Sequence, residues 1–582
     1  MKIVSNIYRK TVLAAAVAFG VLTTSCTDYL TIIPADKVVE ENFWQTKDQI
    51  NGMLATSYLK LLSSDAVSKA IIWGEMRSDN MTFPTTGYNV DIKNLVEANI
   101  IDENGYCRWG IFYEAINYAN LVLETAHKAL ETDPDFTEGD LDVVRGEMFA
   151  MRALCHFYLV RTFRDIPLAT HSAKNDAEIP EYYQVHPLEA LNFIMADLDS
   201  AETRVMKSGA FSSPAQNLGR ITRNAVLAIK ADVNLWRAAF AKYYEGTEYN
   251  LVNSTGTVYV NPADAQMYYN ACVQNCSTLL NNMDLALEEE NKGKPVETFA
   301  YNLIQNRGEK NDKETDHKST AYDEIFGAKN SSESIFELQV QGDNTSNGFA
   351  RGVYNVYGSE GKPGMGCVPT GFVTSNYEED DLRAYSFTNT KSFKQTTSTD
   401  NSTTCITKYS AKSSPAGNYR KADDWDANWI VYRRTDVMLM MADAMVSREG
   451  ATEDDFREAF NMVNAINTRS RMDTTDIVRP LKVANYLNQD AAMKLVRKER
   501  LLELSYEGKR WYDLVRQALI EKSTDNIKFV ADKLESGKDV VKTKMSTIDG
   551  LFLPIHIDEL RYNKNLKQNP AYEKQNSSTE MN

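Results

Sequence analysis

The sequence predicts a mainly α-helical protein made of stacked helical hairpins, with one loop-rich insert between two helical regions. Long stretches of the 582-residue chain repeat apolar side chains at helical spacing, with small residues along one stripe. Such stretches recur at intervals of a few tens of residues, which is typical of tetratricopeptide-like stacking. Between residues 291 and 427 the helical periodicity fades and Gly, Ser, Thr, Asn and Lys become frequent, which indicates the insert.

The clearest helix is predicted over residues 143–167. Gly146, Ala150 and Ala153 recur at helical spacing, so a neighbouring helix can approach closely along this stripe. Larger side chains follow the other stripe, at Leu154, Phe157, Tyr158 and Arg161. Pro167 ends the helix, because the residue before a proline is pushed out of the α-helical conformation. By itself, this stretch fits an ordinary buried helix of any all-α protein equally well.

Taken in order, the chain divides into four predicted parts: a signal peptide (1–25), an N-terminal helical region (26–290), the loop-rich insert (291–427) and a C-terminal helical region (428–582). In the first helical region, the apolar periodicity predicts helices over 50–61, 109–130, 187–204 and 221–243. Alternating residues 334–340 predict a short strand in the insert. The helical pattern returns at residue 429 and predicts helices over 432–447, 453–472 and 491–518.

The N-terminus has the features of a secretory signal. A basic start is followed by an apolar run, Thr11–Leu22, that is too short to span a membrane. Small residues then lead to Cys26, as in a bacterial lipobox, where the cysteine is acylated and becomes the mature N-terminus. The match is imperfect, since Leu22 and Thr23 stand at positions −4 and −3. The alternative is a general secretory signal in which Cys26 has no role.

Composition excludes several classes of function. The net charge is −16 and no sustained Lys/Arg run occurs, so a nucleic-acid partner is not expected. The six histidines are scattered without a nearby pair, and no metal site is predicted. The sequence contains no H-E-x-x-H, G-x-S-x-G or phosphate-binding glycine loop. We therefore expect no cofactor and no catalytic residues.

A series of motifs in a fixed order gives the most specific signal. The blocks lie at residues 25–30, 43–44, 74–80, 109–120, 145–167, 380–383, 428–444, 497–514 and 553–572. In this order they resemble the SusD/RagB family of outer-membrane nutrient-binding lipoproteins over nearly the whole chain. The most distinctive block is R-x-E-R…E-G-x-R-W-x-D-L, matched by Arg497–Arg500 and Glu507–Leu514. One departure is His556, where the terminal P-I-P motif usually has its second proline.

The resemblance implies a SusD-like fold with about four tetratricopeptide-like helix pairs. It also implies a protein anchored in the outer membrane by lipid on Cys26, exposed at the cell surface and partnered by a SusC-like TonB-dependent β-barrel transporter. Such a protein captures a glycan, or a peptide in RagB-like members, and does not catalyse a reaction. Two rival classes remain. A surface glycoside hydrolase would need two carboxylates about 5–10 Å apart, and a helical-repeat scaffold would need no small ligand.

Signature residues are expected to hold the scaffold together. The family-motif tryptophans should pack in the core, namely Trp44, Trp109, Trp236, Trp429 and Trp511. The charged members of the distinctive block, Arg497, Glu499, Arg500 and Arg510, should form ion pairs, because a buried charge must be paired.

Ligand contacts are therefore sought in loops outside the signature, since the family has no fixed ligand motif. Aromatic rings stack on the C–H faces of sugars, and amides or guanidinium groups bind the hydroxyls. The candidates are Trp425, Tyr354, Tyr357 and Tyr88, with Asn355 and Arg351 as polar neighbours and Trp73 at the border of a signature block. Each could instead pack a loop or contact the transporter. The acidic run Glu378–Asp381 could hold Ca²⁺ or form a solvated face.

Overall fold

The computed structural model describes residues 43–84, 88–174, 178–180, 182–252, 255–293, 299–306, 320–340, 367–378, 380–388, 406–410, 427–471 and 480–573. The predicted signal peptide and Cys26 lie outside these residues. None of the helices in this part of the chain combines the length and the apolar character that a membrane span requires.

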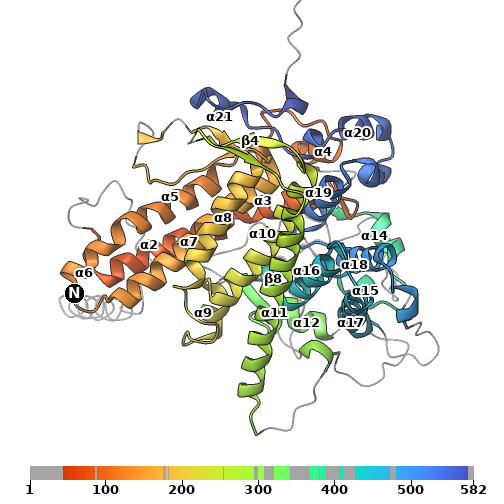
Figure 1. The fold of residues 1–582 in the computed structure, drawn as a ribbon, viewed down its shortest axis with the longest axis horizontal. Helices are drawn as coiled ribbons and strands as arrows, with labels where there is room; N and C mark the ends of the chain where they lie inside the picture. Colours follow the sequence, from red (N-terminus) through yellow and green to blue (C-terminus); the bar gives the residue numbers. More distant parts are fainter. Residues whose placement is uncertain are drawn as a thin grey trace, which may run out of the picture.

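Long helices packed in chain order form the body of the molecule (Figure 1). The N-terminal region contributes α2 (Lys47–Leu62), α3 (Ser64–Glu75), α5 (Gly110–Thr125), α7 (Glu138–Phe163), α8 (Pro187–Glu202), α10 (Arg223–Tyr243) and α11 (Asp264–Glu290). The C-terminal region contributes α16 (Arg434–Ser447), α17 (Glu453–Arg469), α18 (Gln489–Leu504) and α19 (Arg510–Glu521). Contacts run from α2 to α5, α7, α8, α10, α11 and α16 in succession. The predicted mainly α-helical fold is confirmed.

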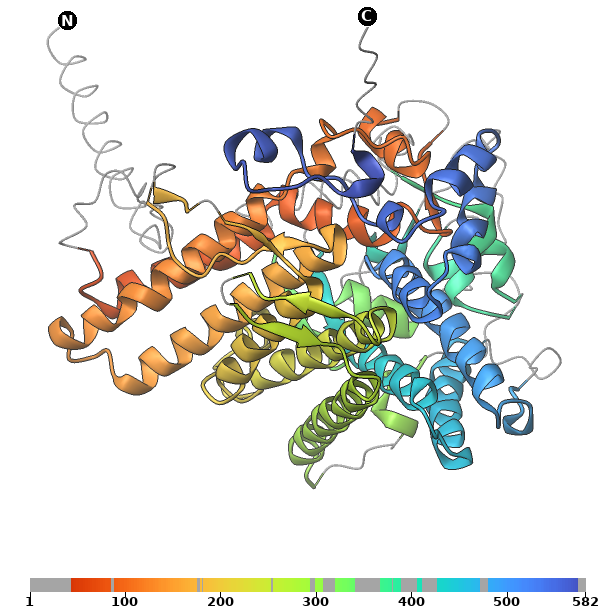
Figure 2. The same ribbon diagram turned by 45° about the horizontal axis from the view of Figure 1, so that its top comes forward.

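Short elements complete the fold. The smaller helices are α4 (Val90–Val96), α6 (Ala129–Thr132), α9 (Pro214–Gly219), α12 (Thr320–Gly327), α14 (Gly371–Asn376), α15 (Arg383–Ser386), α20 (Lys538–Lys544) and α21 (Ile557–Tyr562). The strands form antiparallel pairs: β1 (Met81–Thr82) with β7 (Val368–Pro369), β2 (Ile166–Pro167) with β3 (Gln184–Val185), β4 (Glu248–Asn250) with β5 (Thr257–Tyr259), and β6 (Ser334–Leu338) with β8 (Trp429–Arg433). Figure 2 shows the C-terminal segment, in blue, lying over the N-terminal helices in orange.

Helix α7 begins five residues before the predicted start at residue 143, because polar capping groups extend it. The Thr137 hydroxyl accepts a hydrogen bond from the Asp140 main chain, and the Asp140 carboxylate accepts one from the Thr137 main chain, which makes a capping box. At Gly146, a Cβ atom would lie 2.8 Å from main-chain nitrogen Val205 N, so the close approach predicted for the small stripe is present. The helix ends at Phe163, and Arg164 then adopts a φ of +67°.

Two segments differ from the sequence prediction. Residues 429–433, predicted to begin the returning helix, form β8, because β6 offers a partner strand and both are buried along their whole length. The helical stretch predicted over 491–518 is two helices. The turn between them has positive φ at Tyr506 and Gly508, and a Cβ atom on Gly74 of α3 would lie 1.8 Å from the Gly508 carbonyl oxygen. The break between the two helices lets the turn at Gly508 contact α3 directly.

The signature residues occupy the positions expected of them. All five motif tryptophans are buried. Arg500 pairs with Asp513 at 2.9 Å, and Arg510 pairs with Asp79 at 2.8 Å. Arg497 pairs with Glu521, and Glu499 with Arg383. The prediction that these charged residues form ion pairs is confirmed.

At the centre of this charged region, Glu503 accepts hydrogen bonds from Arg433 (2.8 Å), Arg469 (2.7 Å) and Arg383 (3.2 Å), all fully buried. Burial alone would raise the pKa of Glu503, but the surrounding guanidinium groups hold it well below its usual range. Lys408, from the insert, joins the network. Its ammonium donates to the main-chain oxygens of Glu503 and Ser505 and to the Glu507 carboxylate at 2.6 Å. A single buried cluster thus attaches the insert to the C-terminal helices.

Candidate functional site

The pair β1–β7 brings together two stretches that the sequence nominated separately. Met81 lies opposite Pro369, and Thr82 opposite Val368. Strand β1 leads on to Tyr88, and β7 follows directly on residues 341–366, which carry four of the other candidates. Because the strands are antiparallel, the chain leaving β1 and the chain entering β7 meet at the same end of the pair. Both loops therefore start from one fixed base.

A buried lysine holds this base in place. The Lys533 ammonium donates hydrogen bonds to the carbonyl oxygens of Met76 (2.9 Å), Ser78 (2.5 Å) and Met81 (2.9 Å). Burial lowers the pKa of Lys533 to about 7, although Asp79 acts in the opposite direction. Two of these carbonyls belong to the turn between α3 and β1 and the third to Met81 of β1, so one side chain fixes the backbone that leads to Tyr88.

Tyr88 is an exposed ring at the edge of this base, 38% accessible to solvent. Phe83 packs edge-on against it, with ring centroids 5.6 Å apart, and the Lys93 nitrogen lies 4.9 Å from its centroid. Asn89 caps α4 by accepting hydrogen bonds from the main chain of Asp91 and Ile92. The cap and the ring contacts position an aromatic face beside a cation, a combination suited to stacking on a sugar ring.

The other end of the insert is anchored by Asn428. Its side-chain oxygen accepts a hydrogen bond from the Val340 main chain at 2.9 Å, and its amide donates to Glu337 at 2.7 Å. Residue 341 and residue 426 adjoin this contact in the chain, and Trp425 stands three positions before Asn428. Five candidates lie outside the described residues and remain predictions: Trp425, Tyr354, Tyr357, Asn355 and Arg351.

Trp73 is a core residue, and its nomination as a ligand contact is corrected. Only 2% of its surface is accessible. Its ring stacks on Phe112 with centroids 5.1 Å apart and meets Phe163 edge-on at 5.5 Å. The indole N–H donates to the Tyr106 carbonyl at 2.8 Å, so its polar group is satisfied inside the protein. The ring offers no face to a ligand.

Three carboxylates of the acidic run form ion pairs with arginines. Glu378 and Asp380 pair with Arg471 at 2.8 and 2.5 Å, and Asp381 pairs with Arg383 at 2.8 Å. Within the described ranges, no group of His, Cys, Asp and Glu side chains is arranged to hold a metal ion. These carboxylates therefore connect the insert to the scaffold.

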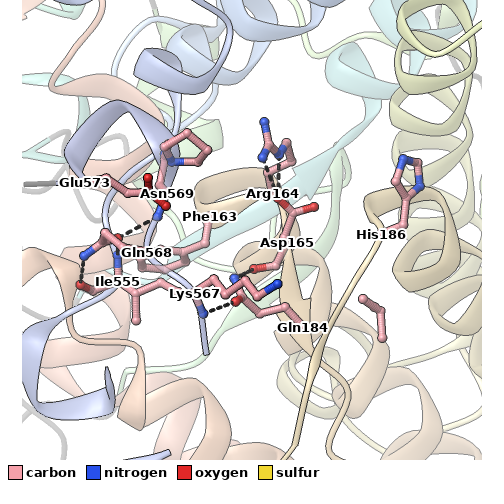
Figure 3. A pocket seen from close by; sticks show the side chains of 12 residues that line it. Phe163, Arg164, Asp165, Gln184, His186, Ile555, Lys567, Gln568, Asn569 and Glu573 are labelled. Atoms are coloured by element: carbon pink, nitrogen blue, oxygen red, sulfur yellow. Dashed lines mark hydrogen bonds and ion pairs between the residues drawn. The ribbon is translucent and has the colours of Figure 1, made fainter. Parts of the chain in front are cut away.

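A groove that no sequence motif predicts lies between β3 and the C-terminal segment (Figure 3). It consists of two adjoining cavities of about 280 and 340 Å³ that share Gln184 and Lys567. The walls come from residues 163–165, 183–186 and 252 and, in the C-terminal segment, from 555, 565, 567–570 and 573. No local sequence motif predicts such a site, because the residues of its walls are distant in sequence and come together only in the folded chain.

Comparisons with known proteins agree with this architecture. Residues 373–572 match the SusD family, and residues 28–235 match a family described as starch-binding and associating with the outer membrane. The SusD-like protein P38 of Formosa agariphila is 24% identical over 524 residues, covering 86% of this chain and 89% of that protein. The SusD-like protein P2 of the same organism is also 24% identical, over 525 residues.

Solved structures share the fold over most of the chain. A SusD homolog from Bacteroides thetaiotaomicron superposes with a TM-score of 0.65 at 17% identity, covering 91% of this chain and 98% of that one. A Bacteroides vulgatus protein described as sugar-binding gives a TM-score of 0.60 at 20% identity, covering 91% and 99%. Family models match both helical regions, so this chain belongs to the SusD family, and the solved structures share its fold over nine-tenths of its length.

Proposed function

We propose that this chain is a cell-surface lipoprotein, acylated at Cys26, that binds a glycan and delivers it to a SusC-like TonB-dependent transporter without cleaving it. Membership of the SusD family supports glycan binding and outer-membrane association. The observation that carries the proposal is the shared base at β1–β7, from which both the Tyr88 loop and the 341–366 segment extend.

In this proposal, aromatic rings on the two loops stack on the C–H faces of successive sugars, while polar neighbours bind hydroxyl groups. Tyr88, Tyr354 and Tyr357 supply the rings on these loops, and Trp425 supplies one from the other end of the insert. Asn355 and Arg351 supply the hydrogen bonds. The rigid base supports affinity, since loops with fixed ends lose less conformational freedom on binding. Lys533 and the β1–β7 hydrogen bonds provide that rigidity.

Native affinity electrophoresis of a soluble chain lacking residues 1–26 tests the binding. Gels containing starch, xylan, laminarin or galactomannan should retard the chain with at least one polysaccharide, and Trp425→Ala or Tyr88→Ala should weaken that retardation about tenfold. Phe299→Ala removes an exposed ring elsewhere and should leave it unchanged. Retention on casein peptides and on no polysaccharide would instead identify a peptide-binding member.

Anchoring, delivery and the absence of cleavage have separate readouts. Cys26→Ala should lower the share of the full-length chain in the membrane fraction, because the lipid anchor is lost and only the contact with the transporter remains. A tagged chain purified from detergent-solubilised outer membranes should bring a β-barrel transporter with it. Reducing ends should not increase when the bound polysaccharide is incubated with the protein, and an increase would favour a hydrolase.

A further inference from the structure

We propose that the groove between β3 and the C-terminal segment is a second glycan-binding site, which takes a short neutral oligosaccharide. This inference rests on the proposed function, but it concerns a different surface from the loops at β1–β7. The two cavities, of about 280 and 340 Å³, each lie near the lower end of the roughly 300–1,000 Å³ usual for ligand sites. Gln184 and Lys567 line both cavities, so the two lie side by side and together offer room for more than one sugar ring.

Exposed rings gather around this groove. Tyr183 lines it and is 57% accessible. Tyr562 is the most exposed large apolar side chain among the described residues. The next residue, Asn563, donates a side-chain hydrogen bond to the Tyr182 carbonyl at 2.7 Å, which holds this part of the chain beside Tyr183. On the other side, the half-buried Tyr249 of β4 stacks on His186 with centroids 4.0 Å apart and so holds this wall residue in place. Solvent-exposed aromatic faces beside a concave polar surface are what sugar rings stack upon.

The polar groups of the groove are held rigidly. The Gln184 amide accepts a hydrogen bond from the Lys567 main chain (2.7 Å) and donates to the Asp165 carbonyl (3.0 Å), as Figure 3 shows. The Gln568 amide bonds both the N–H and the carbonyl of Ile555, at 2.8 and 2.9 Å. These internal hydrogen bonds hold the wall of the groove in one shape, which lowers the conformational cost of binding a ligand. Satisfied main-chain groups leave these positions unable to pair with a peptide backbone.

The charge balance favours a neutral ligand. Arg164 is neutralised by Asp165 and Asp549, both within ion-pair contact. Lys567 and Glu573 carry opposite charges, and neither forms an ion pair with another described residue. Burial lowers the pKa of His186 to about 4, with Arg164 acting in the same direction, so this imidazole is uncharged at neutral pH. The four charged residues that line the groove, Arg164, Asp165, Lys567 and Glu573, carry no net charge, and the Lys567 ammonium is available to donate to sugar hydroxyls.

The test compares groove variants with loop variants in the same affinity gels. Tyr183→Ala and Lys567→Ala should each reduce retardation by starch, xylan, laminarin or galactomannan about fivefold to tenfold relative to wild type. Tyr183→Ala combined with Tyr88→Ala should lower retardation further than either single variant. Phe299→Ala, an exposed ring outside both sites, should match wild type. Thermal unfolding of each variant should match wild type, since both groove side chains are exposed.

The outcomes separate the two proposals. If a polysaccharide retards wild type and the Tyr88→Ala variant loses retardation, while both groove variants behave like wild type, the second site is wrong and the proposed function stands. If no polysaccharide retards wild type, the proposed glycan binding itself fails, and the second site with it. Binding of casein peptides that is lost only in the groove variants would overturn the assignment of this groove to a glycan.

Discussion

Glu503 is the carboxylate whose loss should most disturb the scaffold, and Glu503→Gln is the sharpest test of the buried charge network. The substitution keeps the shape of the side chain and removes one negative charge from among three guanidinium groups at 2.7–3.2 Å. Each arginine keeps another carboxylate partner: Arg433 keeps Glu507, Arg469 keeps Glu333, and Arg383 keeps Asp381 and Glu499. The substitution therefore weakens the network without leaving a guanidinium group unpaired.

Removing one member of a buried ion pair usually costs about 3–5 kcal/mol, because the remaining charge stays desolvated. With a urea m-value of about 3 kcal/mol/M for a large chain, that cost corresponds to a midpoint lowered by roughly 1–2 M. Urea titration followed by near-ultraviolet circular dichroism measures it. The matched control is Glu289→Gln, which removes the same charge from a pair with Lys292 whose side chains are 76% exposed, and which should change stability by less than about 0.5 kcal/mol.

The pH dependence gives an independent check on Glu503. Its pKa is lower in the folded chain than in the unfolded chain, so its contribution is present above the ordinary carboxylate pKa and is lost as pH falls below that value. Wild-type stability should therefore decline more steeply than that of Glu503→Gln in acid, and the two curves should approach each other. Equal urea midpoints for Glu503→Gln and Glu289→Gln at neutral pH would refute the idea that the cluster stabilises the fold.

Three further predictions concern the base of the candidate site and the core. Lys533→Met should remove the Lys533 hydrogen bonds to the carbonyls of Met76, Ser78 and Met81, at a cost of about 1–3 kcal/mol, and should increase amide hydrogen exchange near Tyr88. Lys528→Met, in the same helical segment but partly exposed, should change neither. Gly74→Ala should reduce the yield of folded protein severely, since the new Cβ would lie 1.8 Å from a carbonyl oxygen, whereas Gly52→Ala has free space and should stabilise α2 by about 0.5–1 kcal/mol in thermal unfolding. Trp73→Phe should lower the urea midpoint while leaving polysaccharide retardation per folded molecule unchanged, because the indole hydrogen bond lies inside the core.

By itself, the sequence determined the helical class, most helix positions and the structural role of the signature residues. Helical periodicity is a local property, and buried tryptophans and paired charges follow from hydrophobicity and the cost of burying an unpaired ion. The burial of Trp44, Trp109, Trp236, Trp429 and Trp511 is the plainest example. Loop aromatics could be nominated in the same way, by exclusion from the signature.

Only the tertiary structure decided what depends on partners distant in the chain. Residues 429–433 became a strand because β6 lies beside them, and Trp73 became a core residue because Phe112 and Phe163 surround it. The base at β1–β7, the Lys533 contacts and the groove at Gln184 and Lys567 each join segments hundreds of residues apart. Such contacts form when packing brings separate segments together, so no local spacing in the sequence encodes them.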